Sequence, residues 1–225
     1  MKKQNLISIL FPQMCLICGK HCNSNVCNKC FLKFRKQNLF NLTKNSNQYF
    51  QKHLYLFKYE NEIRNIILDY KFHEKSYLSQ LFVQIIIKNE KICRFLKSYD
   101  IIIEIPIHKK RKFERGYDQS KLIAKKIAKE LSIEYAKNAL VKQKNTIAQS
   151  TLNRKERFAN SQNVYKIQNS QKINGKRVIL FDDIFTTGAT ANSCSKLLQE
   201  NGAKEILIFT LAKDILKTNN KDKKI

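Results

Sequence analysis

The segment 178–190 limits the possible folds of this chain more than any other, because an apolar run leads there into two adjacent carboxylates and then a Thr- and Gly-rich loop. Val178 to Phe181 is short and apolar on both faces, which is typical of a fully buried strand. Asp182 and Asp183 follow directly, at the position where open α/β sheets bind ligands. Two such carboxylates can accept hydrogen bonds from the vicinal hydroxyls of a ribose.

The loop after the two carboxylates has the composition of an anion site. Its three threonines offer hydroxyls, and its backbone offers N–H groups. Gly188 removes a Cβ where the backbone must approach a ligand closely or adopt a positive φ. A helical pattern begins near Thr190 and adds the partial positive charge of a helix N-terminus. The predicted phosphate-binding residues are Thr186, Thr187, Gly188, Ala189 and Thr190. In an ordinary strand and turn, two carboxylates at the strand end would cost free energy unless they were paired or solvated. We therefore interpret the segment as a cradle for a ribose 5-phosphate.

The cradle segment resembles the phosphoribosyl-pyrophosphate (PRPP) signature of type I phosphoribosyltransferases. Other phosphate motifs are absent, because the chain contains no Gly-x4-Gly-Lys-[Ser/Thr] loop and no Gly-x-Gly-x-x-Gly, and has only five glycines. A P-loop ATPase and a Rossmann dehydrogenase are therefore set aside.

The N-terminal region contains five of the seven cysteines, including two Cys-x-x-Cys pairs. Two such pairs can place four thiolates on one tetrahedral zinc. We expect a structural zinc bound by Cys15, Cys18, Cys27 and Cys30. His21 and Cys22 are surplus, and either could replace one of these ligands.

Disulfides are the alternative role for these cysteines. Residues 1–12 contain only a brief apolar run, interrupted by Ser8 and Pro12, which is too short for a secretory signal. We therefore expect a reducing, cytoplasmic location, where zinc is favoured over disulfides. No apolar run approaches the length of a membrane span.

The net charge of +25 has two interpretations. It can mark a surface for nucleic acid or polyphosphate, or it can reflect a Lys-, Asn- and Ile-rich composition with solvated lysines. Residues 105–119 concentrate the charge after an apolar strand, in a predicted basic turn. There, Arg115 and Gly116 suit a pyrophosphate, because a forked guanidinium matches phosphate oxygens and glycine permits close approach. A simply solvated turn is the alternative.

Hydrophobic periodicity predicts the main elements. Helical spacing covers 63–70, 78–87, 124–131 and 191–198, and strand patterns cover 53–59, 101–107, 178–181 and 206–211. Residues 32–52 are polar and predict a helix end followed by a linker. Strands and helices alternate from residue 99 onward, which predicts an α/β fold with a parallel sheet flanked by helices.

Several further segments complete a pattern that covers residues 6–213. They are the two Cys-x-x-Cys pairs, Tyr59-Glu60-Asn61-Glu62-Ile63-Arg64, Tyr70-Lys71-Phe72, Pro106…Arg115-Gly116-Tyr117-Asp118-Gln119, Gln149…Leu152-Asn153-Arg154-Lys155-Glu156-Arg157-Phe158-Ala159-Asn160 and the carboxylate cradle. In order and spacing they resemble the ComF family. Asp118 departs from the family, which usually has Asn there.

The resemblance implies a zinc-finger module (1–35) and a type I phosphoribosyltransferase-like domain (53–213). Residues 214–225 are polar with no apolar period, which predicts a flexible basic tail. It implies a role in DNA uptake during natural transformation, with single-stranded DNA and a competence helicase as partners.

The resemblance also implies roles for single residues. Asp182 and Asp183 would hold the ribose hydroxyls and help to place Mg²⁺. Arg115, with Lys109 or Arg111, would meet the pyrophosphate. The segment 149–160, with Arg154 and Arg157, would close over PRPP.

Two functions remain open at this point. The protein is a DNA-uptake accessory that binds PRPP and Mg²⁺ without turnover, or it is an active phosphoribosyltransferase that acts on an unidentified base or amine. No residue identifies an acceptor, and with no Trp and scattered Tyr and Phe, no base-stacking platform is recognisable from the sequence.

Overall fold

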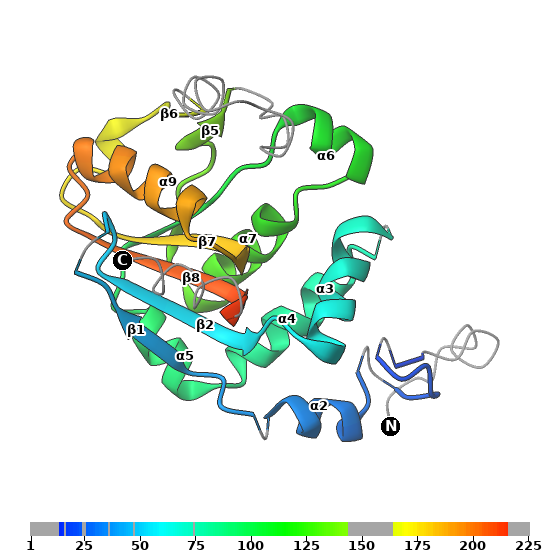
Figure 1. Cartoon of the computed structure of the whole chain (residues 1–225). Helices are drawn as coiled ribbons and strands as arrows, with labels where there is room; N and C mark the ends of the chain where they lie inside the picture. Colours follow the sequence, from blue (N-terminus) through cyan, green and yellow to red (C-terminus); the bar gives the residue numbers. More distant parts are fainter. Residues whose placement is uncertain are drawn as a thin grey trace.

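The centre of the fold is a six-stranded sheet in the order β1–β2–β8–β7–β3–β4 (Figure 1). The computed structural model describes residues 14–15, 17–23, 26–35, 37–46, 48–73, 75–143 and 164–215. All neighbouring strands of the sheet are parallel except β1 and β2. The strands of this sheet are β1 (Asn41–Lys44), β2 (Lys52–Lys58), β3 (Ile101–Glu104), β4 (Glu134–Tyr135), β7 (Arg177–Phe185) and β8 (Glu205–Lys213). In a separate two-stranded sheet, the β5–β6 hairpin, β5 (Leu140–Lys142) pairs antiparallel with β6 (Tyr165–Ile167). The predicted α/β fold with a parallel sheet is confirmed.

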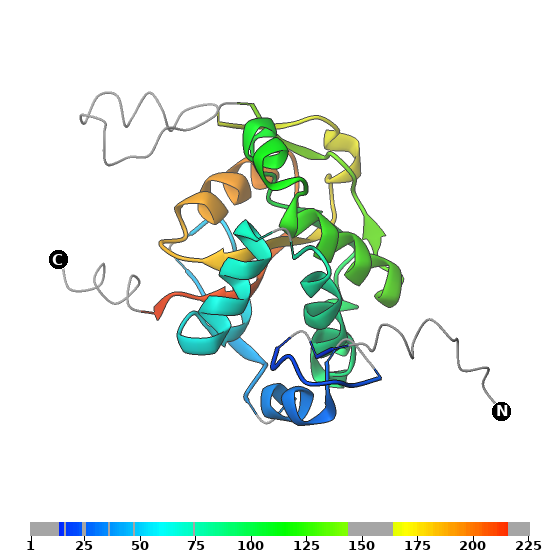
Figure 2. The same ribbon diagram turned by 90° about the vertical axis from the view of Figure 1, so that its right-hand side faces the viewer.

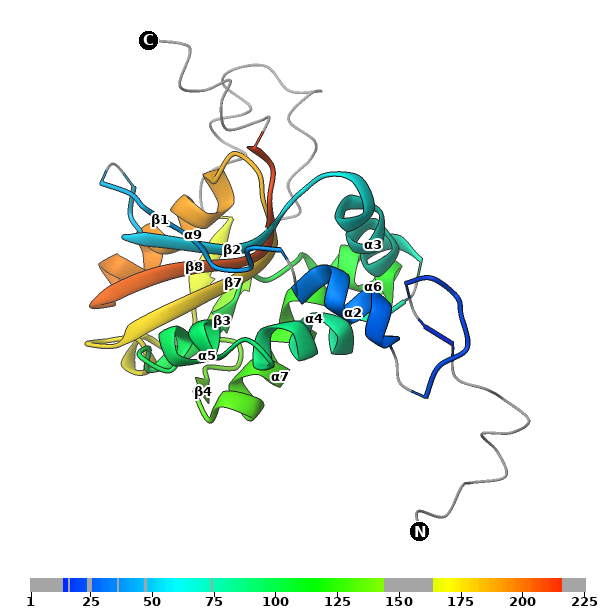
Figure 3. The ribbon, with the colours of Figure 1, turned by 90° about the horizontal axis from the view of Figure 1, so that it is seen from below.

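Helices cover both faces of this sheet, and different helices pack on each face (Figure 3). The helices are α2 (Asn28–Arg35), α3 (Asn61–Phe72), α4 (Leu78–Ile87), α5 (Glu90–Leu96), α6 (Lys109–Arg115), α7 (Gln119–Leu131) and α9 (Ala189–Glu200), with a 3-10 turn η2 (Ser170–Lys172). Side chains of α3, α4, α5 and α7 pack on one face, against β-strand residues such as Phe181 and Phe209. The other face is covered by α9 and the β5–β6 hairpin, against residues such as Leu180 and Ile208.

The chain reverses its direction of winding between β3 and β7. From β3 the chain passes through α7 to β4, toward one edge of the sheet, whereas from β7 it passes through α9 to β8, toward the other edge. These two helices lie on opposite faces. The carboxyl ends of β3 and β7 therefore flank a topological switch point, where open α/β sheets bind their ligands.

The helix after the cradle follows its predicted pattern. The residues expected on its buried face, Ala191, Cys194, Ser195 and Leu198, are the buried residues of α9. The helix ends at Glu200, and Gly202 follows with φ of +84°, a conformation that favours glycine. The helical spacing of apolar residues and the glycine after the helix were sufficient to predict α9, because one face of this helix packs on the sheet.

Four expectations about the elements were wrong. The strand predicted for 101–107 ends at Glu104. Residues 32–52 are not only a helix end and linker, because they contain β1, which pairs antiparallel with β2. The strand predicted for 178–181 continues to Phe185, because β8 pairs with it as far as Phe185↔Lys213. The basic segment that we expected to turn forms the helix α6, because His108 caps its start and Gly116, with φ of +74°, caps its end.

The N-terminal module shares its core with the sheet domain. Cys15, Val26, Cys30 and Phe34 belong to the same apolar cluster as the residues of α3 and α4. Phe34 of α2 meets Phe57 of β2 edge to face, with 5.7 Å between ring centroids. Figure 3 shows α2 alongside α3 and α4. Within the described part of the chain, no helix combines the length and the apolar character that crossing a membrane requires.

Candidate functional site

The two carboxylates of the cradle lie at an open place in the sheet. On one side, β7 stays paired with β8 through Asp182↔Thr210 and beyond. On the other side, the last residue of β3 is Glu104, which pairs with Phe181. Asp182 and Asp183 therefore extend past the end of β3, at the switch point, where side chains of other elements can reach them.

Asp183 forms an ion pair with Lys71, a residue to which the sequence analysis assigned no role. Its Oδ1 lies 2.9 Å from Nζ of Lys71, and the two side chains are only 10% and 17% exposed. Lys71 lies in the last turn of α3, directly after the buried Tyr70. Its place in the segment Tyr70-Lys71-Phe72, quoted above for the family resemblance, was the available signal.

Asp182 has partners different from those of its neighbour. Its Oδ1 accepts hydrogen bonds from Ser120 Oγ at 3.0 Å and from the Asp183 backbone N–H at 2.9 Å. Burial and the charge of Asp183 raise the pKa of Asp182 to about 7, although Lys71 and these hydrogen bonds act in the opposite direction. Asp182 is thus a carboxylate that exchanges a proton near neutral pH.

The loop between β7 and α9 rests on an aromatic ring. Gly188 has φ of +74° and is the N-cap of α9. A Cβ at this position would lie 2.6 Å from Cζ of Phe185, so only glycine fits without a shift. Thr187 and Thr190 are exposed beside it, and the Ala189 N–H points to Thr187 Oγ1 at 3.4 Å. The loop therefore presents backbone N–H groups and hydroxyls at a helix N-terminus, as an anion site requires.

Behind the loop, a buried histidine supports the ring of Phe185. His53 stacks on Phe185 with 4.1 Å between centroids, and its Nε2 lies 3.0 Å from Thr210 Oγ1. Burial, with a smaller effect of the charge on Lys213, lowers the pKa of His53 to about 3. His53 is therefore neutral at physiological pH and acts as a packing element beneath the cradle.

Arg115 and Arg111 line a cavity of about 390 Å³ beside Lys71. Phe72 and Glu114 complete its lining. The Arg115 guanidinium lies 4.9 Å from the centre of the Phe72 ring, and its Nη1 donates to Gln119 Oε1 at 3.1 Å. Partial burial lowers the pKa of Arg115, whereas the nearby charge of Asp183 raises it. Two guanidinium groups thus converge on the side of the cradle where Asp183 lies.

Lys109 lies elsewhere. Residues two apart on a helix point to nearly opposite sides, so Lys109 faces away from the cavity that Arg111 and Arg115 line. The structure brings Arg111 and Arg115 together with the carboxylates, but it does not bring Lys109 there. The loop 149–160, with Arg154 and Arg157, lies outside the described residues.

Two buried acidic residues, Glu104 and Asp118, lie near the carboxyl end of β3. Asp118 is the N-cap of α7 and accepts from the Lys121 N–H at 3.0 Å. Asn and Asp are about equally good N-caps, which accounts for Asp118 where the family usually has Asn. Glu104 accepts from the Tyr135 hydroxyl at 2.9 Å, and burial raises the pKa of both acids. Glu104 was missed, although a lone acid in the apolar run 101–107 was a signal.

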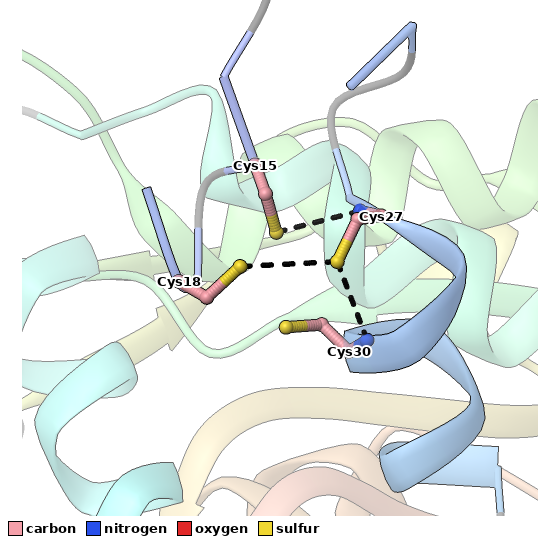
Figure 4. Close-up of side chains that lie close together, drawn as sticks. All are labelled: Cys15, Cys18, Cys27 and Cys30. Carbon is pink, nitrogen blue, oxygen red and sulfur yellow. Dashed lines mark hydrogen bonds between the residues drawn. The ribbon is translucent and has the colours of Figure 1, made fainter. Parts of the chain in front are cut away.

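The four cysteines of the two Cys-x-x-Cys pairs point toward one centre (Figure 4). The sulfurs of Cys15, Cys18, Cys27 and Cys30 lie within 4.8 Å of one another and could hold a metal ion. All seven cysteines lie in the described part of the chain, and none forms a disulfide. His21 pairs with Met14 in an isolated β-bridge, and neither it nor Cys22 belongs to the four-sulfur group.

Hydrogen bonds shift the pKa values of the thiols in this cluster. The Cys27 N–H donates to Cys15 Sγ at 3.4 Å, and the Cys30 N–H donates to Cys27 Sγ at 3.5 Å. Burial would raise the pKa of Cys15, but hydrogen bonds from backbone N–H groups and from the Cys18 thiol lower it to about 6. Burial and the neighbouring thiols raise the pKa of Cys30. These hydrogen bonds thus favour the thiolate at Cys15, the form that ligates metals, whereas they favour the protonated thiol at Cys30.

Known proteins resemble this chain over most of its length. A sequence model of the family described as phosphoribosyl transferase domain matches residues 118–225, which include the cradle. Competence protein F of Haemophilus influenzae is 28% identical over 200 residues, which are 87% of this chain and 84% of that protein. Competence protein ComFC of Streptococcus pneumoniae is 30% identical over 161 residues, 72% of this chain and 68% of that protein. The chain belongs to the ComF family.

Other similarities of this ComF-family protein are more distant. DNA utilization protein YhgH of Escherichia coli is 26% identical over 116 residues, which span 52% of this chain and about half of YhgH. Among solved structures, adenine phosphoribosyltransferase from Thermoanaerobacter pseudethanolicus has a TM-score of 0.41 at 11% identity, covering 86% of this chain and 94% of that one. The fold is that of a type I phosphoribosyltransferase-like domain with an N-terminal cysteine cluster.

Proposed function

We propose that this ComF-family protein binds PRPP with Mg²⁺ in the cradle and handles single-stranded DNA during DNA uptake in natural transformation. The observation that carries the proposal is the convergence of three groups at one switch point. The carboxylates of β7 and the loop before α9 lie there, and the arginines of α6 line the cavity beside Lys71, the ion-pair partner of Asp183. A sugar that bears a phosphate at one end and a pyrophosphate at the other needs these three kinds of contact.

Each part of PRPP would lie against protein groups that can bind it. The 5-phosphate would lie against the backbone N–H groups of 187–190 and the start of α9, where the helix dipole favours an anion. The ribose hydroxyls would donate to Asp182 or Asp183. The pyrophosphate would meet Arg111 and Arg115, whose guanidinium groups can bind phosphate oxygens in pairs.

The carboxylates also fit Mg²⁺. This ion is usually bound by one or two carboxylates together with substrate phosphates, and Asp182 and Asp183 are both within the cradle. Bound there, Mg²⁺ would offset the charge of the pyrophosphate. Lys71 neutralises Asp183 through its 2.9 Å ion pair.

Calorimetric titration with PRPP and Mg²⁺ tests the cradle. We expect binding to the native protein and its loss in the double variant Asp183→Ala, Thr187→Ala. A matched control is Asp69→Asn, which changes another carboxylate that pairs with a lysine, on the same helix as Lys71. Equal PRPP affinity in the native protein and the double variant would contradict the proposal.

Two observations support the DNA-handling part of the proposal. Relatives of the chain are named competence proteins and DNA utilization protein. The net charge of +25 favours a polyanion. Affinity for oligothymidylate should fall steeply with salt, by about ten-fold or more between low and physiological salt, because neutralised phosphates release counterions. Negligible affinity at low salt would refute this part.

Active transfer of phosphoribose to a base or amine is the second candidate, and Asp182 favours it. A carboxylate with a pKa of about 7 suits general acid–base catalysis at neutral pH. The test is acceptor-dependent release of pyrophosphate from PRPP with a panel of bases and amines. Release that depends on one acceptor would establish turnover, and binding without release would favour the accessory role.

For the cysteine cluster we infer structural zinc. A tetrahedral site with Zn–S bonds of about 2.3 Å places sulfurs about 3.8 Å apart, and Cys18 and Cys27 have a sulfur separation of 3.8 Å. Elemental analysis should find about one zinc per chain. Cys18→Ala should lose this metal and Cys22→Ala should keep it; disulfides in place of zinc would reverse the inference.

A further inference from the structure

The helix α6 divides the basic run into two faces of different composition. With 100° between successive residues, the side chains of Arg111, Glu114 and Arg115 lie on one side, and these are the α6 residues that line the 390 Å³ cavity. The opposite side presents Lys109, Lys110, Lys112 and Phe113. The arginines therefore face the cradle, whereas the lysines and the phenylalanine face outward.

Phe113 is the unusual member of the outer face. It is 91% exposed, and no residue of α6 is buried. Single exposed apolar residues are common, but this ring lies within a group of three lysines on a short helix at the margin of the molecule (Figure 2). Lysines at three or four positions before it lie next to its ring on the helix surface.

We propose that the outer face of α6 is the contact for single-stranded DNA, with one base stacked on Phe113 and the backbone phosphates held by Lys109, Lys110 and Lys112. This assignment rests on the proposed DNA-handling function and gives that function a surface. Proteins that bind single strands without sequence preference combine positive charge along the backbone with aromatic rings under the bases. One exposed ring with lysines on the same helix face meets both requirements.

Other occupants fit this face less well. A helix that lies in a membrane surface presents a broad apolar side to the acyl chains, and α6 presents one ring. A stable protein interface has an apolar core that excludes water, which a single ring among lysines does not provide. The charge and composition of the face therefore favour a nucleic acid.

The division of α6 also places DNA close to the cradle. A helix with its side chains is about 10–12 Å across, so a strand on the outer face would lie one helix diameter from the arginines that line the cavity beside Lys71. The two anions would be bound back to back on one short helix, without sharing a contact residue.

Stacking and charge can be measured separately. Affinity for oligothymidylate is measured by fluorescence anisotropy over a range of salt concentrations, with the full chain. Phe113→Ala should weaken binding by between about five-fold and about a hundred-fold, and it should leave the salt dependence unchanged, because no ionic contact is lost. Lys109→Gln and Lys110→Gln should each reduce the slope of log affinity against log salt by about 0.7.

An oligomer of abasic sites distinguishes stacking from a general loss of binding. It has phosphates but no bases, so Phe113→Ala should bind it as well as the native protein does. Leu32→Ala is the matched control, because Leu32 is an exposed apolar residue, 48% accessible, on the distant helix α2. It should behave as the native protein with both oligomers.

The outcomes separate this assignment from the function on which it rests. If the native protein binds oligothymidylate and Phe113→Ala binds it equally well, the surface is wrong and the DNA-handling function stands. If the native protein does not bind, both are wrong. If Phe113→Ala loses binding to vesicles with anionic lipids but not to DNA, the face is a membrane contact. Unchanged PRPP titration and thermal unfolding in Phe113→Ala, together with weaker DNA binding, would support the assignment.

Discussion

Replacement of Gly188 by alanine should damage the cradle far more than its small size suggests. The new Cβ would lie 2.6 Å from Cζ of Phe185 and 3.2 and 3.3 Å from its two Cε atoms. Phe185 has little room to move, because it stacks on His53 at 4.1 Å and meets Phe50 edge to face at 6.1 Å. The loop must therefore shift away from its position above the ring.

The cost has two parts. A residue with a Cβ in the left-handed region costs about 1–2 kcal/mol, and overpacking against a fixed core costs about 1–3 kcal/mol. If the loop rearranges to relieve both, the sum of about 2–5 kcal/mol is lost from PRPP binding, which is about thirty-fold or more in Kd. The measurement is calorimetric titration with PRPP and Mg²⁺, alongside thermal unfolding.

Gly175 provides the matched control for this experiment. It has φ of +72° and no atom within 4 Å of a built Cβ, so Gly175→Ala has the backbone cost without the clash. A second test is Gly188→Ala combined with Phe185→Leu, which removes the ring and should recover part of the affinity. If Gly188→Ala binds PRPP as tightly as Gly175→Ala does, the ring is not the floor of the cradle and the reasoning fails.

Three further predictions concern single side chains. Lys71→Met leaves Asp183 buried and without its ion-pair partner, so the free energy of unfolding in urea should fall by about 3 kcal/mol. Lys33→Met breaks an exposed ion pair and should change this free energy little. Equal effects of the two variants would contradict the burial argument. The pKa of His53 is lowered to about 3 in the folded state from an ordinary 6.5, so stability should be lost as pH falls from about 6.5 toward 3, and His53→Phe should flatten this dependence in pH-resolved thermal unfolding. Asp118→Asn keeps the N-cap of α7, so the melting temperature should change by less than about 2 °C, and a large drop would indicate a role beyond capping.

The sequence predicted the parts of the site that depend on neighbours along the chain. The apolar run before Asp182, the glycine at 188 and the buried stripe of α9 were all recognised, because strand, turn and helix each have a local pattern. The spacing of the four clustered cysteines was likewise sufficient to group them.

The parts that were missed depend on tertiary contacts. Lys71 reaches Asp183 from a helix more than one hundred residues earlier in the chain, and nothing near Lys71 in the sequence indicates that partner. β7 continues to Phe185 because β8 pairs with it there, although the apolar run has ended. The helix α6 has no apolar face to give it a period, so its two caps, His108 and Gly116, define it instead.

The position of β8 in the sheet has a consequence for synthesis on the ribosome. Among the described strands β8 is the last in chain order, yet it lies between β2 and β7 and pairs with both along its length. The two sides of the sheet therefore cannot be joined until residues 205–213 have left the exit tunnel. Until then, β2 and β7 each expose an unpaired edge, the kind of edge that pairs with other chains. A nascent chain stalled before β8 should thus remain unable to close its sheet and should depend on chaperones, whereas one that has released β8 can complete the sheet.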